Sequence, residues 1–239
     1  MDDEPDQLER LDAFFASLQQ ADKKALRRDV EALIAVARDA PEVAVKLRDA
    51  LDRVPAEKRW PIAYVLAHIS PLSPPCLEAL KSALQTSDPD IRWAVALLLV
   101  DLEKKPNSGV AAHLIDLIDK GNPAQRRMAV YCLRDIHADD PTHGHAVQNA
   151  LEDLDPLVRI AALTSLKAFP MIGGSATDRL LELVATDADS RVRSSAAIAL
   201  AHLAAPTEKV FRALNDAARS SDIKLAKAAR AALALLENR

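Results

Sequence analysis

The segments SDPDIRWAVALLL (87–99), DLDPLVRIAALTSL (153–166) and DADSRVRSSAAIAL (187–200) share one pattern. In each, a turn forms around an aspartate, an arginine follows four residues later, and a leucine follows eleven residues later. The same columns recur every 33 or 34 residues along the whole chain of 239 residues. A fixed period in this range is typical of solenoids, in which similar supersecondary units stack on one another.

Seven repeats account for nearly the whole chain. The turn column holds Asp22, Pro55, Asp88, Asn122, Asp155, Asp189 and Asp222. Four residues later, the column that we call the arginine column holds Leu26, Arg59, Arg92, Arg126, Arg159, Arg193 and Ala226. We therefore expect a single domain over residues 1–239, with approximate repeats at 1–40, 41–73, 74–107, 108–140, 141–174, 175–206 and 207–239.

Each repeat is predicted to contain two helices joined by a tight turn. Asp88-Pro89, Asn122-Pro123, Asp140-Pro141 and Asp155-Pro156 are typical of an N-cap residue followed by proline at the first helical position. We interpret 173–175, Gly-Gly-Ser, as part of a link between repeats. Neither helix can bury its apolar stripe alone, so neighbouring repeats must stack. The predicted fold is all-α, a right-handed α-solenoid of seven two-helix repeats.

Charge and cysteine content narrow the classes of function. The formal net charge is −4, and residues 1–22 hold seven acidic side chains against one base, Arg10, which leaves the rest of the chain close to neutral. A near-neutral body disfavours nucleic acid and anionic membranes as partners. No apolar run approaches the length of a membrane span. Cys76 and Cys132 stand at unrelated positions, so we expect reduced thiols in a cytoplasmic protein.

The three segments quoted above resemble HEAT-like repeats of the phycobilisome-lyase type. In that family an acidic turn precedes Val-Arg and then small residues where helices approach closely. The resemblance covers repeats three to six well and the others more loosely, and it implies an adaptor or scaffold. It also implies that the arginines pair with turn acids of their own or a neighbouring repeat in a ladder along the solenoid. The ladder residues would be Arg59, Arg92, Arg126, Arg159 and Arg193 with Asp88, Asp155 and Asp189, and Asp153 and Asp187 match the same pattern.

Helical rotation separates two faces of each second helix. Positions 3, 6, 7 and 10 after the arginine column face the core, and in the second, third and fourth repeats they hold Ile62, Val65, Leu66, Ile69, Val95, Leu98, Leu99, Leu102, Ala129, Cys132, Leu133 and Ile136. Positions 1 and 5 lie opposite, on the side that lines the concave groove in HEAT-like arrays. We call these two columns the groove face.

Every tryptophan and tyrosine of the chain falls on the groove face. Exposed aromatic side chains beside an arginine are typical of binding hot spots. The predicted partner-binding residues are Trp60, Tyr64, Trp93, Leu97, Arg127 and Tyr131, and the predicted polar rim is His68, Asp101, Arg134 and Asp135. The alternative is that the aromatics fill space between second helices where the solenoid curves. Pro61 predicts a helix that starts at Trp60 or Pro61, so Trp60 lies either in the groove or at the helix mouth.

A cluster of histidines and aspartates is a candidate metal site. His137, Asp139, Asp140, His143 and His145 cluster between the fourth and fifth repeats, and such side chains can bind a divalent ion. However, Asp140-Pro141 is typical of a helix start, and the spacing matches no structural zinc motif. The iron-binding HEAT-like hydroxylases use His-Glu pairs, whereas none of the six histidines here is followed by glutamate. We expect no metal and no cofactor.

Two other enzyme classes stay open as alternatives. HEAT-like alkylpurine DNA glycosylases use concave Trp, Tyr, Arg and Asp, which would correspond here to Trp93, Tyr131 and either Asp101 or Asp135. The regular repeats and the small excess of base disfavour that class. Bilin lyases have similar repeats, but their pigment-binding residues have no counterpart here. The predicted function is a non-catalytic protein-interaction scaffold that binds a partner protein segment in its concave groove.

Overall fold

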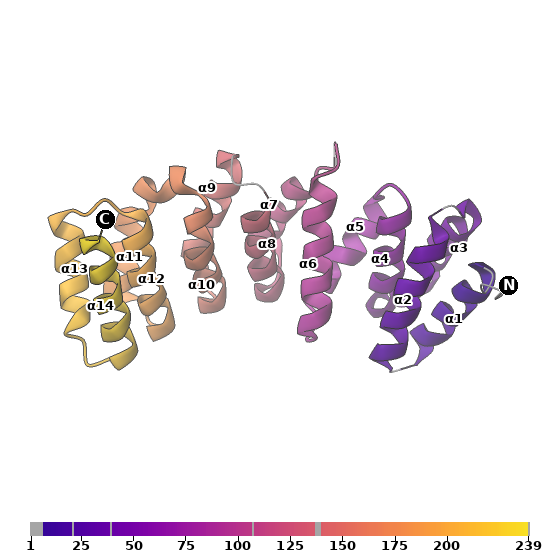
Figure 1. Cartoon of the computed structure of the whole chain (residues 1–239), viewed down its shortest axis with the longest axis horizontal. Coiled ribbons are helices and arrows are strands. Elements are labelled where there is room, and N and C mark those ends of the chain that lie inside the picture. The colour runs from indigo at the N-terminus through magenta and orange to yellow at the C-terminus, as the bar shows by residue number, and fades with distance from the viewer. Residues whose placement is uncertain (1–6, 21, 39, 107, 137–139, 239) are drawn as a thin grey trace. The chain divides into compact units, whose positions relative to one another are not determined.

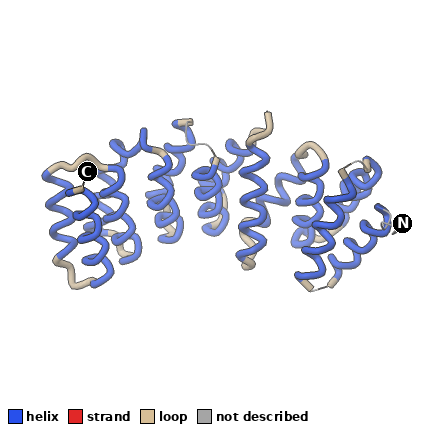
Figure 2. The backbone as a smooth tube through the Cα atoms, viewed as in Figure 1, coloured by secondary structure: helices blue, strands red, loops and turns tan. Residues whose placement is uncertain are grey.

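The computed structural model describes residues 7–20, 22–38, 40–106, 108–136 and 140–238, and every regular element within these ranges is a helix (Figures 1 and 2). The α-helices are α1 (Gln7–Gln19), α2 (Lys23–Ala37), α3 (Pro41–Arg53), α4 (Arg59–Ile69), α5 (Pro74–Ala83), α6 (Pro89–Glu103), α7 (Val110–Lys120), α8 (Pro123–Asp135), α9 (Pro141–Asn149), α10 (Pro156–Ser165), α11 (Gly173–Thr186), α12 (Ser190–Leu203), α13 (Glu208–Ala218) and α14 (Ile223–Glu237). Short 3-10 helices are η1 (Ala56–Lys58), η2 (Ala150–Glu152), η3 (Leu166–Ala168) and η4 (Pro170–Ile172). The predicted all-α repeat fold is confirmed.

The helices form two compact units, Met1–Leu102 and Glu103–Arg239, and each is described by itself. In the first unit α1 packs on α2, α3 on α4, α4 on α5, and α2 on α4. In the second unit α7 packs on α8, α11 on α12, and α13 on α14. There the second helices α8, α10, α12 and α14 contact one another in sequence order, more extensively than the first helices do. They therefore form the tighter layer of that unit.

The predicted caps and core positions explain how these helices begin and pack. Asp22, Asp155 and Asp222 accept hydrogen bonds from the first backbone N–H groups of α2, α10 and α14. Asn122 forms a reciprocal capping box with Gln125 at the start of α8. The predicted core positions are buried, apart from Ile69, which is half-buried: Ile62, Val65, Leu66, Val95, Leu98, Leu99, Leu102, Ala129, Cys132, Leu133 and Ile136.

Two helix starts differ from the sequence-based expectation. Helix α4 begins at Arg59, so Pro61 lies in its first turn, where a missing N–H costs no intrahelical bond. Gly173 and Gly174 are the first residues of α11 and not part of a link. The link lies earlier, in η3 and η4, because Phe169 and Ile172 are drawn into the core there. Burial of these apolar side chains overrides the turn preference of the glycines.

An arginine ladder connects successive repeats of the second unit. The Arg126 guanidinium donates to both carboxylate oxygens of Asp153, from Nε at 2.6 Å and from Nη2 at 2.7 Å. Arg159 donates in the same way to both oxygens of Asp187, at 2.8 Å each. The remaining Nη1 groups donate to the backbone oxygens of Gly121 and Asp153. These mostly buried bidentate pairs join each second helix to the turn of the next repeat.

Of the acids that match the ladder pattern, Asp153 and Asp187 bind the ladder arginines. Asp155 and Asp189 use a carboxylate oxygen to cap α10 and α12, and Asp88 accepts from the backbone N–H of Asp90. Because these cap oxygens are directed at their own helices, the arginines bind carboxylates two residues earlier. Where that earlier residue is Ser220, the cap residue Asp222 itself receives Arg193, through one hydrogen bond of 3.1 Å.

The first two arginines of the arginine column, Arg59 and Arg92, have local partners. Arg59 Nε donates to the backbone oxygen of Val54 at 3.2 Å, and Arg92 Nη1 donates to that of Thr86. Both acceptors belong to the turn that precedes the arginine's own helix. These two arginines therefore brace the turn within one repeat, whereas Arg126, Arg159 and Arg193 bind carboxylates of the following repeat.

We expect Asp187→Ala to lower the free energy of unfolding by about 3–5 kcal/mol, because it leaves the buried Arg159 guanidinium unpaired. The matched variant Asp189→Ala removes a helix cap and the exposed ion pair with Arg191, and it should cost about 1 kcal/mol. Urea denaturation of both variants measures the difference. Equal losses would contradict the assignment of Asp187 as the ladder acid.

Gly144 permits a close approach between α9 and η4. A Cβ atom at this position would lie 2.6 Å from Ile172 Cγ1, whereas one at Gly174 would meet nothing within 4 Å. Gly144→Ala should therefore destabilise by about 1–3 kcal/mol through overpacking. Gly174→Ala should stabilise by about 0.4–1 kcal/mol, because it restricts the unfolded chain. Thermal melts of the two variants should shift in opposite directions.

Candidate functional site

In the first unit the groove face presents two exposed apolar side chains on α6. Trp93 is 40% exposed and Leu97, one helical turn later, is 61% exposed. Trp60 is the second residue of α4, and its side chain is half-buried. Trp60 thus lies in the first turn of its helix. Large apolar side chains with exposed fractions this high are typical of interaction surfaces.

Tyr64 connects the groove face of α4 to that of α2. Its ring lies 4.7 Å from the His68 ring, and His68 Nδ1 lies 2.8 Å from the Tyr64 backbone oxygen. Burial raises the Tyr64 pKa, the Glu31 carboxylate raises it further, and the Arg27 guanidinium partly offsets this. Arg27 Nε donates to Glu31 Oε1 at 2.9 Å. A charged pair therefore lies beside the half-buried phenol.

Sequence reasoning missed Arg27 and Glu31, although the repeat contains the signal that finds them. They stand one and five residues after Leu26, the member of the arginine column in the first repeat. They therefore occupy the same two columns as Trp60 and Tyr64. The hydrogen bond to Glu31 raises the Arg27 pKa, and the charge of Asp90, at the start of α6, raises it further. The groove face of the first unit thus begins with charge on α2.

The other predicted site residues lie in the second unit, apart from Asp101, which is exposed on α6. Arg127 and Tyr131 are half-buried on α8. The Arg134 guanidinium lies 5.2 Å from the centre of the Tyr131 ring, a cation–π arrangement, and donates to both oxygens of Asp135 at 2.7 and 2.9 Å. The predicted rim residues Arg134 and Asp135 thus bind each other beside the tyrosine. One groove that joins both units stays a prediction.

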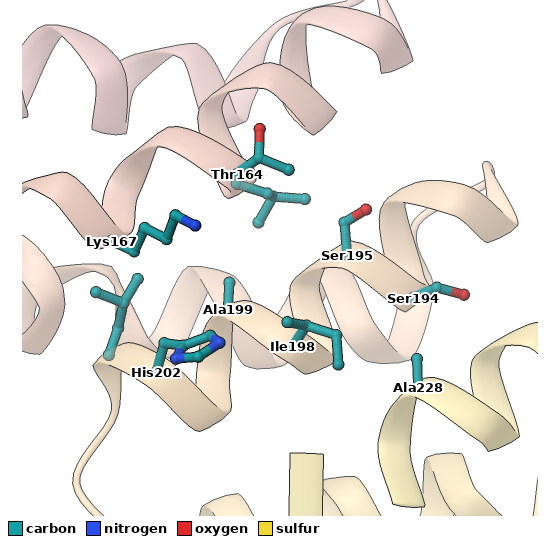
Figure 3. A pocket seen from close by; sticks show the side chains of 10 residues that line it. Thr164, Lys167, Ser194, Ser195, Ile198, Ala199, His202 and Ala228 are labelled. Atoms are coloured by element: carbon teal, nitrogen blue, oxygen red, sulfur yellow. The ribbon is translucent and has the colours of Figure 1, made fainter. Parts of the chain in front are cut away.

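The groove face of the second unit also contains an open depression that the sequence analysis missed. Its volume is about 390 Å³, and its lining comes from α10, η3, α12 and α14 (Figure 3). Lys167 and His202 lie at one end, and Ser194 and Ala228 lie at the other. The groove-face positions that line it hold Thr164, Ser194 and Ile198 in place of aromatic side chains, and that change is the signal in the sequence.

The described residues bear on two features of catalytic sites, metal-binding clusters and reactive thiols. They include no group of three His, Cys, Asp or Glu side chains placed to hold a metal ion, while His137 and Asp139 lie outside them. Asp140 caps α9 instead, through Thr142 N. Burial raises the pKa of the Cys132 thiol to about 12, so this thiol is protonated at neutral pH and is a poor nucleophile. No helix in the described ranges is long and apolar enough to cross a membrane.

Single substitutions of Leu99 and of Trp93 distinguish a core position of α6 from a surface position. Leu99 is fully buried, so Leu99→Ala should lower the free energy of unfolding by about 2–5 kcal/mol. Trp93→Ala removes a side chain that is 40% exposed and should cost clearly less. Chemical denaturation of both variants measures the two losses. If the losses match, Trp93 fills space in the core, and its role in binding is lost.

Comparison with known proteins identifies the repeats. The family model described as HEAT repeats matches residues 44–134, 111–201 and 145–235. No curated protein matches the chain. An engineered protein of known structure is 19% identical over 95% of this chain and 68% of its own, with a TM-score of 0.50.

Two further solved structures are similar at lower scores. A designed armadillo repeat protein in complex with the peptide (KR)4 is 16% identical, over 95% of this chain and 99% of its own, with a TM-score of 0.47. Human deoxyhypusine hydroxylase in complex with glycerol is 19% identical, over 98% of each chain, with a TM-score of 0.44. The family model covers well over half of the sequence, and this chain belongs to the HEAT repeat family.

Proposed function

We propose that this protein is a non-catalytic interaction module that binds a segment of another protein on the groove face of its second helices. The observation that carries the proposal is the exposure of Trp93 and Leu97, one turn apart on α6, in a chain with only 3% aromatic residues. A fold that needs so few aromatics does not require a tryptophan at an exposed position. Burying such side chains against a partner releases water and contributes most of the affinity of many interfaces.

The remaining groove-face residues of each unit supply further aromatic and polar side chains. In the first unit, Trp60 and Tyr64 extend the aromatic surface, with His68 against the Tyr64 ring and Asp101 exposed on α6. In the second unit, Arg127 and Tyr131 offer a guanidinium and a phenol, with Arg134 and Asp135 beside them. Tyrosine, tryptophan and arginine are the residue types enriched at interface hot spots.

The arrangement fits a peptide better than an enzyme substrate. A catalytic site places titratable groups with perturbed pKa values in a cleft. On the groove face of the first unit the resolved perturbations are those of Tyr64, buried beside a charged pair, and of Arg27, which belongs to that pair. The Trp93–Leu97 surface offers apolar area with few charged groups and therefore supports docking.

An affinity pull-down tests the proposal with three variants. Trp93→Ala and Tyr131→Ala should each weaken capture of the partner by about tenfold or more, equivalent to about 1.4 kcal/mol. Leu154→Ala is the matched control, because Leu154 is 95% exposed and lies in the turn before α10, away from the groove face. Partners captured by wild type and by Leu154→Ala, but lost with the other two variants, support the site.

Capture that is equal for all variants would overturn the proposed surface. Retention of the wild-type protein on a DNA column, lost in proportion to added salt, would instead favour a nucleic-acid-binding function.

A further inference from the structure

We propose that the depression between α10, α12 and α14 is a second binding site, selective for an acidic protein segment that carries an apolar anchor side chain. It lies wholly in the second unit and shares no residue with the Trp93–Leu97 surface. Its volume of about 390 Å³ is large enough for one or two apolar side chains of a partner. This inference goes beyond the proposed function, because it assigns a separate site with its own ligand chemistry.

The lining of the depression is apolar, with polar groups around it. Leu163, Ile198 and Leu203 contribute aliphatic carbon from α10 and α12. Ala199 and Ala228 are the small residues of the lining, and Figure 3 shows the Ile198 side chain between them. Such a surface gains free energy when it is covered by an aliphatic side chain, at about 25 cal/mol per Å² of apolar area buried.

The charged side chains of α10, α12 and α14 determine which residues of a partner can bind beside the depression. From Pro156 to Ser165, from Ser190 to Leu203 and from Ile223 to Leu236, these helices carry no acidic side chain, and the sequence of α14 reaches its first at Glu237. Exposed lysines stand at Lys167, Lys224 and Lys227. The acids of this region lie at the turns or on the first helices α11 and α13. These three helices therefore carry only basic charge over the stretches given above, although the net charge of the whole chain is close to neutral.

The exposed lysines are available to a ligand. In the part of the chain that the structure describes, no carboxylate pairs with Lys167, Lys224 or Lys227. The nearby arginines are already engaged: Arg193 with Asp222, and Arg191 with Asp189, whose pKa is lowered by that hydrogen bond. Lys167 stands at the rim of the depression, beside His202 (Figure 3). A carboxylate placed next to the anchor side chain would meet this ammonium group.

The depression fits a peptide better than a nucleic acid. Single-stranded nucleic acids are held by aromatic stacking platforms and by several phosphate contacts. The ten lining residues include no Phe, Tyr or Trp, and their basic groups are Lys167 and His202. The lining crosses α10, α12 and α14, the second helices of three successive repeats, and this is a span of roughly 20 Å at the usual helix spacing. An extended segment of about six residues covers that distance.

Fluorescence anisotropy of the full chain with labelled peptides of about twelve residues tests this site. The probe has two central leucines flanked on both sides by aspartate and glutamate. It should bind about tenfold more tightly than the same peptide with serines in place of the leucines, a difference of about 1.4 kcal/mol. A peptide with the leucines flanked by lysine and arginine should bind at least as weakly as the serine peptide, because like charges meet across the interface.

Variants of the protein locate the binding. Lys167→Glu should weaken the acidic leucine peptide by about tenfold, and Ser195→Leu should weaken it comparably by filling the depression. The matched control is Lys209→Glu on α13, a first helix, where an exposed lysine pairs with Asp178 of α11 away from the depression. It should leave the affinity unchanged. Circular dichroism melts of each variant establish that the fold is retained.

Several results would overturn the inference. The first is that the acidic leucine peptide does not bind the protein at about 1 mM. The second is that the basic peptide binds as tightly as the acidic one. The third is that the protein binds oligothymidylate and that Lys167→Glu weakens this binding. Trp93→Ala should not change peptide affinity. The two proposals can therefore fail separately. A pull-down that depends on Trp93, together with no binding of the acidic leucine peptide, would overturn only the proposed site in the depression. Binding of that peptide, together with capture that does not depend on Trp93, would overturn only the Trp93–Leu97 surface.

Discussion

The burial of apolar stripes by stacking is the constraint on which this structure depends. Each helix has one apolar stripe, and a two-helix repeat alone leaves part of that surface in water. In the second unit α8, α10, α12 and α14 bury theirs by packing in sequence order. The core therefore consists of leucine, valine and alanine at fixed positions of the repeat, exemplified by Leu99, Leu133 and Leu200. Side chains on the groove face do not have to fill this core and can therefore contribute to binding.

Polar interactions add precision to this packing. The cap residues fix where each second helix begins, and the arginine ladder fixes how one repeat sits on the next. The Asp187 carboxylate binds Arg159 and also accepts from the backbone N–H of Asp189, the cap residue of α12, so it joins the ladder to the start of that helix. A buried charge pair of this kind adds less to stability than an apolar contact of equal area, but it penalises misalignment strongly.

The sequence predicted the architecture well because helix caps and core positions are local and periodic. Asn122 and Asp155 cap the helices that their Asn-Pro and Asp-Pro pairs indicated. The start of α11 was missed, because it depends on the burial of Phe169 and Ile172, which are set by packing and not by local preference. The choice between the two acids of each turn was also left open. Periodicity identifies equivalent positions, but it does not say which of two neighbouring carboxylates points to the next repeat.

The candidate site was predictable only in part. The exposure of Trp93 and Leu97 followed from the face of the helix on which they lie. The depression did not, because a hollow depends on several small side chains from three helices and no single residue indicates it. Arg27 and Glu31 could have been found by extending the two groove-face columns to the first repeat.

The ladder has a direction along the chain. Each arginine donates to a carboxylate that comes 27, 28 or 29 residues later, so the donor is always synthesised before its acceptor. During synthesis from the N-terminus, a repeat holds an unpaired guanidinium until the next turn has emerged. Truncation from the two ends is therefore unequal. Removing the last repeat strands a partly buried Arg193, whereas removing repeats from the N-terminal side leaves a carboxylate that water can solvate.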